Sequence, residues 1–172
     1  MDMDSTANYG LWASSTNAYP DGIFAVDCMC YDLGINGTGT GAIPVYIEQV
    51  SRLVVLGSKF DNIQASHCTR IAGGERVVIA NNQFSRSTLS NTHCLTVRGY
   101  TNHVDSAVFE GRYTEKVVIR DNYIMSETAS GYLMHVAPQN DGYAERHRNI
   151  IIERNYFNSM LTSTLYAQVI GG

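Results

Sequence analysis

Val117-Val-Ile-Arg-Asp-Asn-Tyr-Ile124 is the stretch that decides the fold, because three other segments of the chain repeat its pattern. Each copy has three aliphatic residues, two variable residues, a small polar residue, one more variable residue and a large apolar residue. The other copies are Leu53-Val-Val-Leu-Gly-Ser-Lys-Phe60, Val77-Val-Ile-Ala-Asn-Asn-Gln-Phe84 and Ile150-Ile-Ile-Glu-Arg-Asn-Tyr-Phe157. A constant core with variable spacing is typical of stacked supersecondary units with loop insertions. The repeat therefore predicts a solenoid.

The local chemistry of each copy predicts a buried strand that ends in a tight corner. The triplets are β-branched and too short for helices, and the polar residue after them marks a turn, because Asn tolerates left-handed backbone. Amides stacked about 4.8 Å apart can hydrogen-bond along the stack, and Ser58 would continue that ladder. The large residue two places later starts the next strand and points inward. The predicted core column is Phe60, Phe84, Ile124 and Phe157.

A second set of short alternating strands lies between these copies, at 45–48, 67–71, 93–97, 132–136 and 164–168, and residues 23–30 form a degenerate first copy of the main repeat. Three strands per coil and about five coils follow. With its Asn corner, this pattern resembles the right-handed parallel β-helix of the pectate-lyase-like superfamily, which includes polysaccharide lyases, polygalacturonase-type hydrolases and phage tailspikes. The expected organisation is all-β, with a polar N-terminal tail or cap at 1–21 and the β-helix domain at 22–172.

Composition and charge limit the possible partners. Only 16% of the residues are charged, 15 are Gly, and the net charge is −4. Without a basic run we expect no nucleic-acid partner, and without an apolar stretch near ~18 residues we expect no membrane span. The sequence requires no cofactor, although Ca²⁺ is compatible with it. The first residues lack the features of an export signal.

The resemblance implies a protein that acts outside cells or on a virion. Because neither end has an amphipathic cap, which a solenoid needs for solubility, we interpret the chain as a segment of a longer protein. A polar tail folded over one end is the alternative.

The four cysteines predict neither a disulfide framework nor a zinc site. Cys28 and Cys30 have the wrong spacing for a zinc knuckle. Cys68 and Cys94 hold the same register one coil apart, which puts their Cα atoms about 5 Å from each other, within disulfide range. Two stacked small apolar side chains are the simpler alternative.

Function is expected on the outward faces of the second strand set. Alternation gives one outward column of Glu48, Arg70, Thr96, His135 and Gln168. The neighbouring outward column is Tyr46, Cys68, Cys94, Leu133 and Tyr166, and Arg98 projects one step beyond Thr96. Polar, cationic and aromatic side chains at ~4.8 Å intervals suit an extended polymer, because aromatic rings stack on sugars and Arg binds carboxylates. The alternative is an ordinary solvated face with a weak Glu48–Arg70 ion pair.

Two long loops, at 98–115 and 137–148, leave the same side of consecutive coils. Loops of this kind usually gather at one functional face, where they could wall a cleft. The first loop carries His103, Asp105, Glu110, Arg112 and Tyr113. The second carries Asp141, Tyr143, Glu145, Arg146 and His147.

A lyase reaction on a uronate polymer needs a cation for the substrate carboxylate, a base for the C5 proton and an acid for the leaving oxygen. The candidate cations are Arg70, Arg98 and Arg112, the candidate bases are His135 and His103, and the candidate acid is Tyr113. Hydrolysis would need two opposed carboxylates. Asp105, Glu110, Asp141 and Glu145 are available for that role.

Motifs of the superfamily are only partly present. Cys94-Leu-Thr-Val-Arg-Gly99 resembles the strand that carries a catalytic Arg in the alginate and chondroitin lyase family, which implies that role for Arg98. That family's Lys segment has no counterpart, since the only lysines are Lys59 and Lys116. The chain also lacks the adjacent Asp pair and the Gly-His-Gly segment of polygalacturonase-like hydrolases. We therefore expect a carbohydrate-active or carbohydrate-binding β-helix for an extended acidic polysaccharide, with lyase-type cleavage favoured over hydrolysis.

The alternative is a non-catalytic segment of an oligomeric fibre, tailspike or adhesin. The middle residues of the aliphatic triplets should face outward, and such an apolar column is unusual on a solvated face. Arg52, Arg76 and Lys116 would form a basic edge beside it. The column predicts contact with other copies of the chain through Val54, Val78, Val118 and Ile151.

Overall fold

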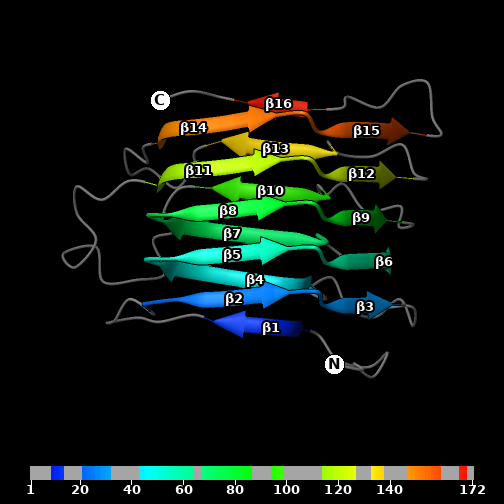
Figure 1. Cartoon of the computed structure of the whole chain (residues 1–172), viewed down its shortest axis with the longest axis horizontal. Helices are drawn as coiled ribbons and strands as arrows, with labels where there is room; N and C mark the ends of the chain where they lie inside the picture. Colours follow the sequence, from blue (N-terminus) through cyan, green and yellow to red (C-terminus); the bar gives the residue numbers. More distant parts are fainter. Residues whose placement is uncertain are drawn as a thin grey trace.

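The computed structural model describes residues 9–13, 21–31, 43–63, 67–86, 94–98, 114–126, 133–137, 147–159 and 167–169. Every regular element in these ranges is a β-strand, and the strands form three parallel sheets (Figure 1). The chain visits the three sheets in turn, which is consistent with a parallel β-helix. We use the word coil for one pass of the chain through the three sheets. Within the described ranges, no helix has the length and apolar character needed to cross a membrane.

We name the three sheets A, B and C. Sheet A has the order β1 (Tyr9–Ala13), β4 (Ile43–Val50), β7 (Thr69–Gly74), β10 (Leu95–Arg98), β13 (Met134–Ala137) and β16 (Ala167–Val169). Sheet B has the order β14 (His147–Glu153), β11 (Thr114–Arg120), β8 (Val77–Ala80), β5 (Leu53–Leu56) and β2 (Ile23–Val26). Sheet C has the order β15 (Tyr156–Ser159), β12 (Tyr123–Ser126), β9 (Gln83–Arg86), β6 (Lys59–Ile63) and β3 (Met29–Tyr31).

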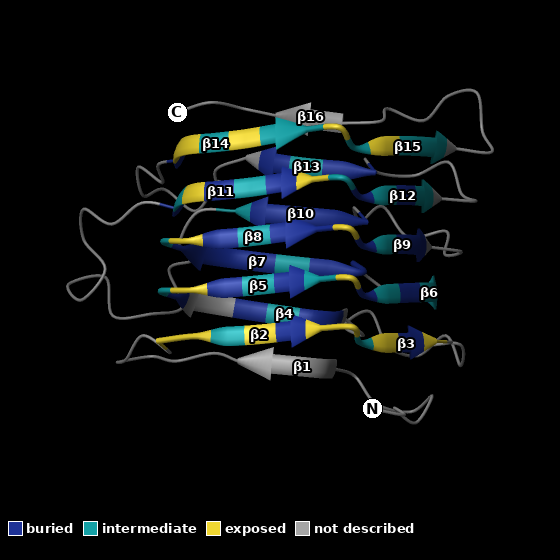
Figure 2. Ribbon diagram, viewed as in Figure 1, coloured by how far each residue is buried: buried dark blue, intermediate teal, exposed yellow. Residues whose placement is uncertain are grey.

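The register of sheet B confirms the alignment of the repeats. Leu53 pairs with Val77, Val77 with Val117, and Val117 with Ile150. Ile23 pairs with Leu53, so the degenerate first copy is also placed as predicted. In β5 and β8 the residues flanking the middle of each triplet are buried and the middle residue is half-buried (Figure 2).

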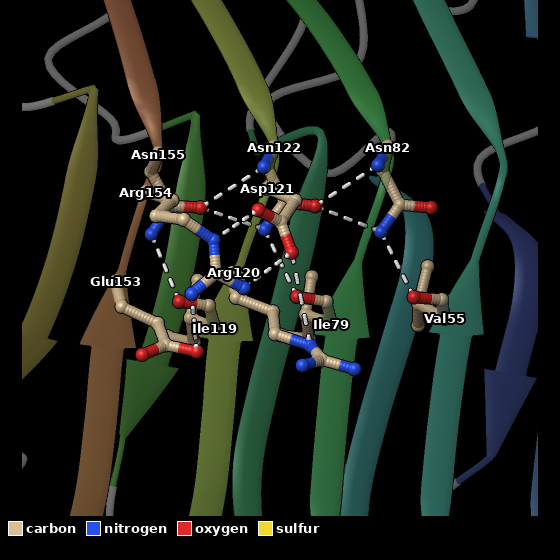
Figure 3. Close-up of polar contacts among 10 residues, drawn as sticks. All are labelled: Val55, Ile79, Asn82, Ile119, Arg120, Asp121, Asn122, Glu153, Arg154 and Asn155. Carbon is tan, nitrogen blue, oxygen red and sulfur yellow. Dashed lines mark hydrogen bonds and ion pairs between the residues drawn. The ribbon is translucent and has the colours of Figure 1, made fainter.

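The predicted amide ladder is present at the corner between sheets B and C (Figure 3). The side-chain Nδ2 of Asn82 donates to Asn122 Oδ1 at 3.0 Å, and Nδ2 of Asn122 donates to Asn155 Oδ1 at 2.9 Å. Each Asn also donates to a main-chain carbonyl of the preceding coil, as Asn82 does to Val55 O at 2.8 Å. Ser58 continues the ladder by accepting from the Cys28 amide at 3.1 Å.

The prediction that the Asn residues of the ladder adopt left-handed backbone was wrong. Left-handed backbone was expected at the ladder residue itself, but the structure places it one residue earlier. Because the buried amide is needed for the ladder, the exposed residue before it takes the turn. The residues with positive φ at this corner are Asp27, Gly57, Asn81, Asp121 and Arg154.

The predicted column of large apolar residues lines sheet C on its inner face. Phe60 pairs with Phe84, Phe84 with Ile124, and Ile124 with Phe157. The Phe60 and Phe84 rings stack with centroids 5.2 Å apart and an interplanar angle of 4°. Ile124 interrupts the aromatic series, so ring stacking in this column is confined to one pair among the described residues.

Three residues predicted to face outward from sheet A belong to the core. Cys68, Cys94 and Leu133 are at most 1% exposed and pack in the main hydrophobic cluster. Each of them lies at a bend just before its strand begins, where the chain leaves the corner from sheet C. Alternation along a strand does not extend through such a bend, which is why the prediction was wrong.

Candidate functional site

The outward face of sheet A brings most of the predicted site strands together. Tyr46 pairs with Arg70, Arg70 with Thr96, and Thr96 with His135, on the consecutive strands β4, β7, β10 and β13. His135 in turn pairs with Gln168 of β16. We call these five residues the sheet A column. Their separation is the strand spacing of roughly 4.8 Å, the repeat that an extended polymer would meet.

The sheet A column corrects one member of the prediction. Glu48 was expected opposite Arg70, but it pairs with Ala72, and Tyr46 takes the place opposite Arg70. The inward residues Val45 and Ile47 pair with Thr69 and Ile71, which places the residue between them, Tyr46, opposite Arg70. Glu48 therefore lies one row away on the same face, beside Ala72.

Arg70 and Tyr46 form the first contact in this column. The guanidinium carbon of Arg70 lies 5.2 Å from the centre of the Tyr46 ring, within cation–π range. The Arg70 Nε–H is buried and donates no hydrogen bond among the described residues. A guanidinium group beside an aromatic ring is suited to a carboxylate or sulfate next to a sugar ring.

Thr96 lies in the column but is fully buried. Its hydroxyl oxygen is 3.0 Å from Nδ1 of His67, which is only 4% exposed. The contact connects two consecutive coils, because His67 lies two residues before β7 and Thr96 belongs to β10. Sequence reasoning placed His67 in a strand and missed this contact. The repeated His-Cys pair at 67–68 and 93–94 was the signal that could have drawn attention to it.

Arg98 is the last residue of β10, and His135 lies two residues before the end of β13. The two long loops leave sheet A from these strand ends. Arg98 pairs with Ala137, the last residue of β13. Across that edge, the Thr114 hydroxyl donates to the Arg98 carbonyl at 2.9 Å, and Thr114 pairs with His147. The ends of both loops are thus side by side, as expected. The predicted loop residue His147 is instead the first residue of β14.

His147 adds a second imidazole to this edge. Its side chain is 7% exposed, and neither ring nitrogen has a hydrogen-bond partner in the described part of the chain. Burial, with a further contribution from the nearby charge of His135, lowers the pKa of His147 from 6.5 to about 4. The imidazole of His147 is therefore neutral near pH 7.

Several predicted site residues cannot be positioned. Tyr166 lies outside the described residues, and Glu48 and Gln168 are placed only by their backbone register. The predicted loop residues that also lie outside the described ranges are His103, Asp105, Glu110, Arg112, Tyr113, Asp141, Tyr143, Glu145 and Arg146.

The described side chains on this face are cationic, polar or aromatic. Tyr46, Arg70, Thr96, Arg98 and His135 bring two guanidinium groups, an imidazole, a hydroxyl and a phenol, and none of them is a carboxylate. Within the described ranges, no group of three or more His, Cys, Asp or Glu residues is arranged to hold a metal ion.

The outward face of sheet B has a different character. The predicted apolar column is present, since Val54, Val78, Val118 and Ile151 are consecutive register partners. Phe24 extends this sheet B column by one coil, and its side chain is 64% exposed.

The predicted basic edge beside the sheet B column is partly neutralised. Arg52 binds Asp21 with N–O distance 2.6 Å, and Glu115 forms ion pairs with both Lys116 and Arg148. The hydrogen bond from Arg148 holds the pKa of Glu115 below its usual value, and Lys116 contributes in the same direction. This edge is therefore a row of mixed charges.

Comparisons with protein-family models, with curated proteins and with solved structures gave no match to this chain.

Proposed function

We propose that the chain is a right-handed parallel β-helix of the pectate-lyase-like type and that it binds an extended acidic polysaccharide along sheet A. The parallel strands in three sheets support the fold, and sheets B and C, with five strands each, support about five coils. Right-handedness follows from the strong preference for right-handed crossovers between parallel strands. Such a protein would act outside cells or on a virion.

The observation that carries the proposal is the sheet A column with Arg98 beside it. Arg70 and Arg98 lie on adjacent strands, with outward positions two residues apart along the strand direction. Two guanidinium groups at this spacing can each pair with a carboxylate of a stretched uronate chain. Tyr46 adds an aromatic surface beside Arg70, which a sugar ring can contact.

The favoured reaction on this face is β-elimination. Arg98 or Arg70 would neutralise the uronate carboxylate and make the neighbouring C5 proton more acidic. His135 would take that proton as the C4–O bond breaks and a C4–C5 double bond forms. The leaving oxygen needs a proton from an acid, the role proposed for Tyr113.

The direct test is ultraviolet absorbance, which reports the unsaturated product of a lyase. The protein would be mixed with alginate, pectate, chondroitin, hyaluronate and bacterial capsule polymers, with and without Ca²⁺. We expect absorbance to rise with one acidic polymer. Binding without a rise would leave a carbohydrate-binding module. The proposal would be contradicted if the protein neither bound nor cleaved any acidic polymer.

A structural role is the second candidate, and the sheet B column favours it. Phe24 and Ile151 at the two ends of this column are 64% and 53% exposed. A flat apolar strip of several coils is the kind of surface that pairs with another copy of the chain in a fibre or tailspike. In that case mass in solution would rise with protein concentration, and no polymer would be cleaved.

A further inference from the structure

Cys68 and Cys94 meet in the core at the corner between sheets C and A. Cys68 immediately precedes β7 and Cys94 immediately precedes β10. The Cys68 amide donates to the Cys94 carbonyl at 2.8 Å, so the two backbones are direct neighbours. Their sulfur atoms are 3.1 Å apart, and both residues are 0% exposed. Neither sulfur is part of a disulfide in this structure.

The other two cysteines are placed differently. Cys30 points into the core opposite Phe60, where burial raises the pKa of its thiol to about 11. Cys28 lies at the preceding corner and is half-buried. Neither has another cysteine sulfur within hydrogen-bond distance among the described residues. Only the Cys68–Cys94 pair therefore has its sulfur atoms in contact.

We propose that Cys68 and Cys94 form a disulfide that joins consecutive coils when the chain folds in the presence of an oxidised small-molecule disulfide such as glutathione disulfide. Neighbouring parallel strands place Cα atoms about 4.8 Å apart, inside the range that disulfides accept. Both cysteines lie at bends outside the regular strands, so their backbones can adjust without breaking a strand pairing. The inference does not depend on the proposed substrate.

The chemistry is two successive thiol–disulfide exchanges. One cysteine thiolate attacks a sulfur of the oxidant, which forms a mixed disulfide and releases one small thiol. The second cysteine then attacks the protein sulfur of that mixed disulfide and releases the other small thiol. The two cysteine protons end on the two released thiols, and the oxidant is reduced by two electrons. Because both sulfurs are inaccessible after folding, this exchange takes place before the core closes.

The expected consequence is a covalent staple close to the sheet A column. It would fix β7 relative to β10, the strands that carry Arg70 and Thr96. The loop it closes, from Cys68 to Cys94, is about 26 residues long. A loop of this length should raise the melting temperature on the order of 5 to 10 °C for a domain of this size.

Trypsin separates the cysteines in a way that allows a direct test. Cleavage after Lys and Arg leaves Cys68 in peptide 60–70, Cys94 in peptide 87–98, and both Cys28 and Cys30 in peptide 1–52. The wild-type protein would be refolded in a glutathione redox buffer, denatured with iodoacetamide to block free thiols, and digested without reductant. We expect peptides 60–70 and 87–98 to be linked to each other and peptide 1–52 to carry two blocked thiols.

A matched control is the double variant Cys28→Ser/Cys30→Ala, which should keep the link between peptides 60–70 and 87–98. Cys68→Ala should abolish the link and remove the dependence of the melting temperature on the redox buffer. The link should also resist a mild reductant in the folded protein and yield to it in guanidinium. Recovery of peptides 60–70 and 87–98 as separate, blocked peptides from oxidatively refolded protein would overturn the proposal. A link from either peptide to 1–52 in its place would overturn it as well.

Discussion

The side-chain amide of Asn82 donates a 3.0 Å hydrogen bond to Oδ1 of Asn122, the residue at the same corner of the next coil. The same oxygen accepts a second bond from the Asn82 main-chain N–H, also at 3.0 Å. Both residues are 2% exposed, so water does not replace these partners readily. The corner of each coil is therefore held by the coil that follows it.

Asn122→Ala should lower the free energy of unfolding by about 3 to 4 kcal/mol, because it leaves two buried groups of the preceding coil unsatisfied. These groups are the Asn82 N–H and the carbonyl of Ile79, which accepts from Asn122 Nδ2 at 2.9 Å. Urea denaturation measures the change. The matched control is Gln83→Ala, at a half-buried outward position of sheet C, which should cost less than about 0.5 kcal/mol. Equal effects of the two variants would contradict the role of the ladder.

Ser58→Asn should stabilise the protein by about 1 kcal/mol by completing the ladder. Ser58 already accepts from the Cys28 amide, and its hydroxyl lies 3.4 Å from the Ala25 carbonyl. An Asn at this corner would reach the same two groups and could also donate to Asn82 Oδ1. Thermal unfolding of the variant tests the prediction, with Ser58→Ala as the control that should be destabilising. A Ser58→Asn variant less stable than Ser58→Ala would show that this corner has no room for the amide.

Stability should fall as the pH drops below about 6.5, because His147 resists protonation in the folded protein. Its folded pKa of about 4 is lower than its ordinary value of 6.5, so the unfolded chain binds the proton first. The contribution is intact above pH 6.5 and is lost progressively down to about pH 4. The full loss is roughly 3 kcal/mol.

The pH prediction is measured as urea denaturation between pH 7 and about pH 5. In that window the carboxyls of Glu115 and Asp121 stay ionised, because hydrogen bonds from Arg148 and Arg154 lower their pKa values. His147→Gln removes the titrating ring and should flatten the pH dependence relative to the wild type. An unchanged slope would mean that another group is responsible.

Arg98→Ala and His135→Ala should each reduce kcat/KM on the cleaved polymer by a hundredfold or more, because each removes a group that acts on the transition state. The melting temperature should change little, since both residues are only half-buried and occupy alternate register positions of sheet A. Arg120→Ala, at an exposed outward position of sheet B, is the matched control and should keep full activity. Full activity in both test variants would exclude this face as the site.

Val78→Asp should abolish self-association, if the chain assembles through the sheet B column. The substitution places a carboxylate in the middle of the apolar strip, between Val54 and Val118, where burial against another copy would be costly. Light scattering over a range of concentrations compares the variant with wild type, and Gln83→Ala on sheet C serves as the control. A wild-type protein that stays monomeric at every concentration would exclude this assembly.

Much of the fold was accessible from the sequence because period-two alternation and the Asn corner are local signals. The four repeats were aligned correctly, as the pairing of Leu53 with Val77 and of Val117 with Ile150 demonstrates. The inward column that contains Phe60 and Phe84 followed from the same alignment. These features depend on neighbours two to seven residues away, which any single copy already contains.

The candidate site was less accessible, because it depends on contacts between coils. The contact between the Thr96 hydroxyl and His67 Nδ1 joins residues 29 positions apart in the sequence. No local sequence pattern predicts such a contact. The burial of His147 likewise depends on its pairing with Thr114 across a long loop. Sequence reasoning located the strands of sheet A but could not decide which of their side chains are exposed, since Thr96 is fully buried.

The sequence by itself determined the parallel strands, the amide corner and the inward and outward sides of the sheet B strands, because alternation and turn chemistry act within one coil. Only the tertiary structure decided that Tyr46 faces Arg70, that Cys68 contacts Cys94, and that left-handed backbone precedes the ladder. Each of these depends on how one coil closes onto the next. Closure is set by hydrogen bonds and packing between residues distant in sequence, so it emerges only when the coils are stacked.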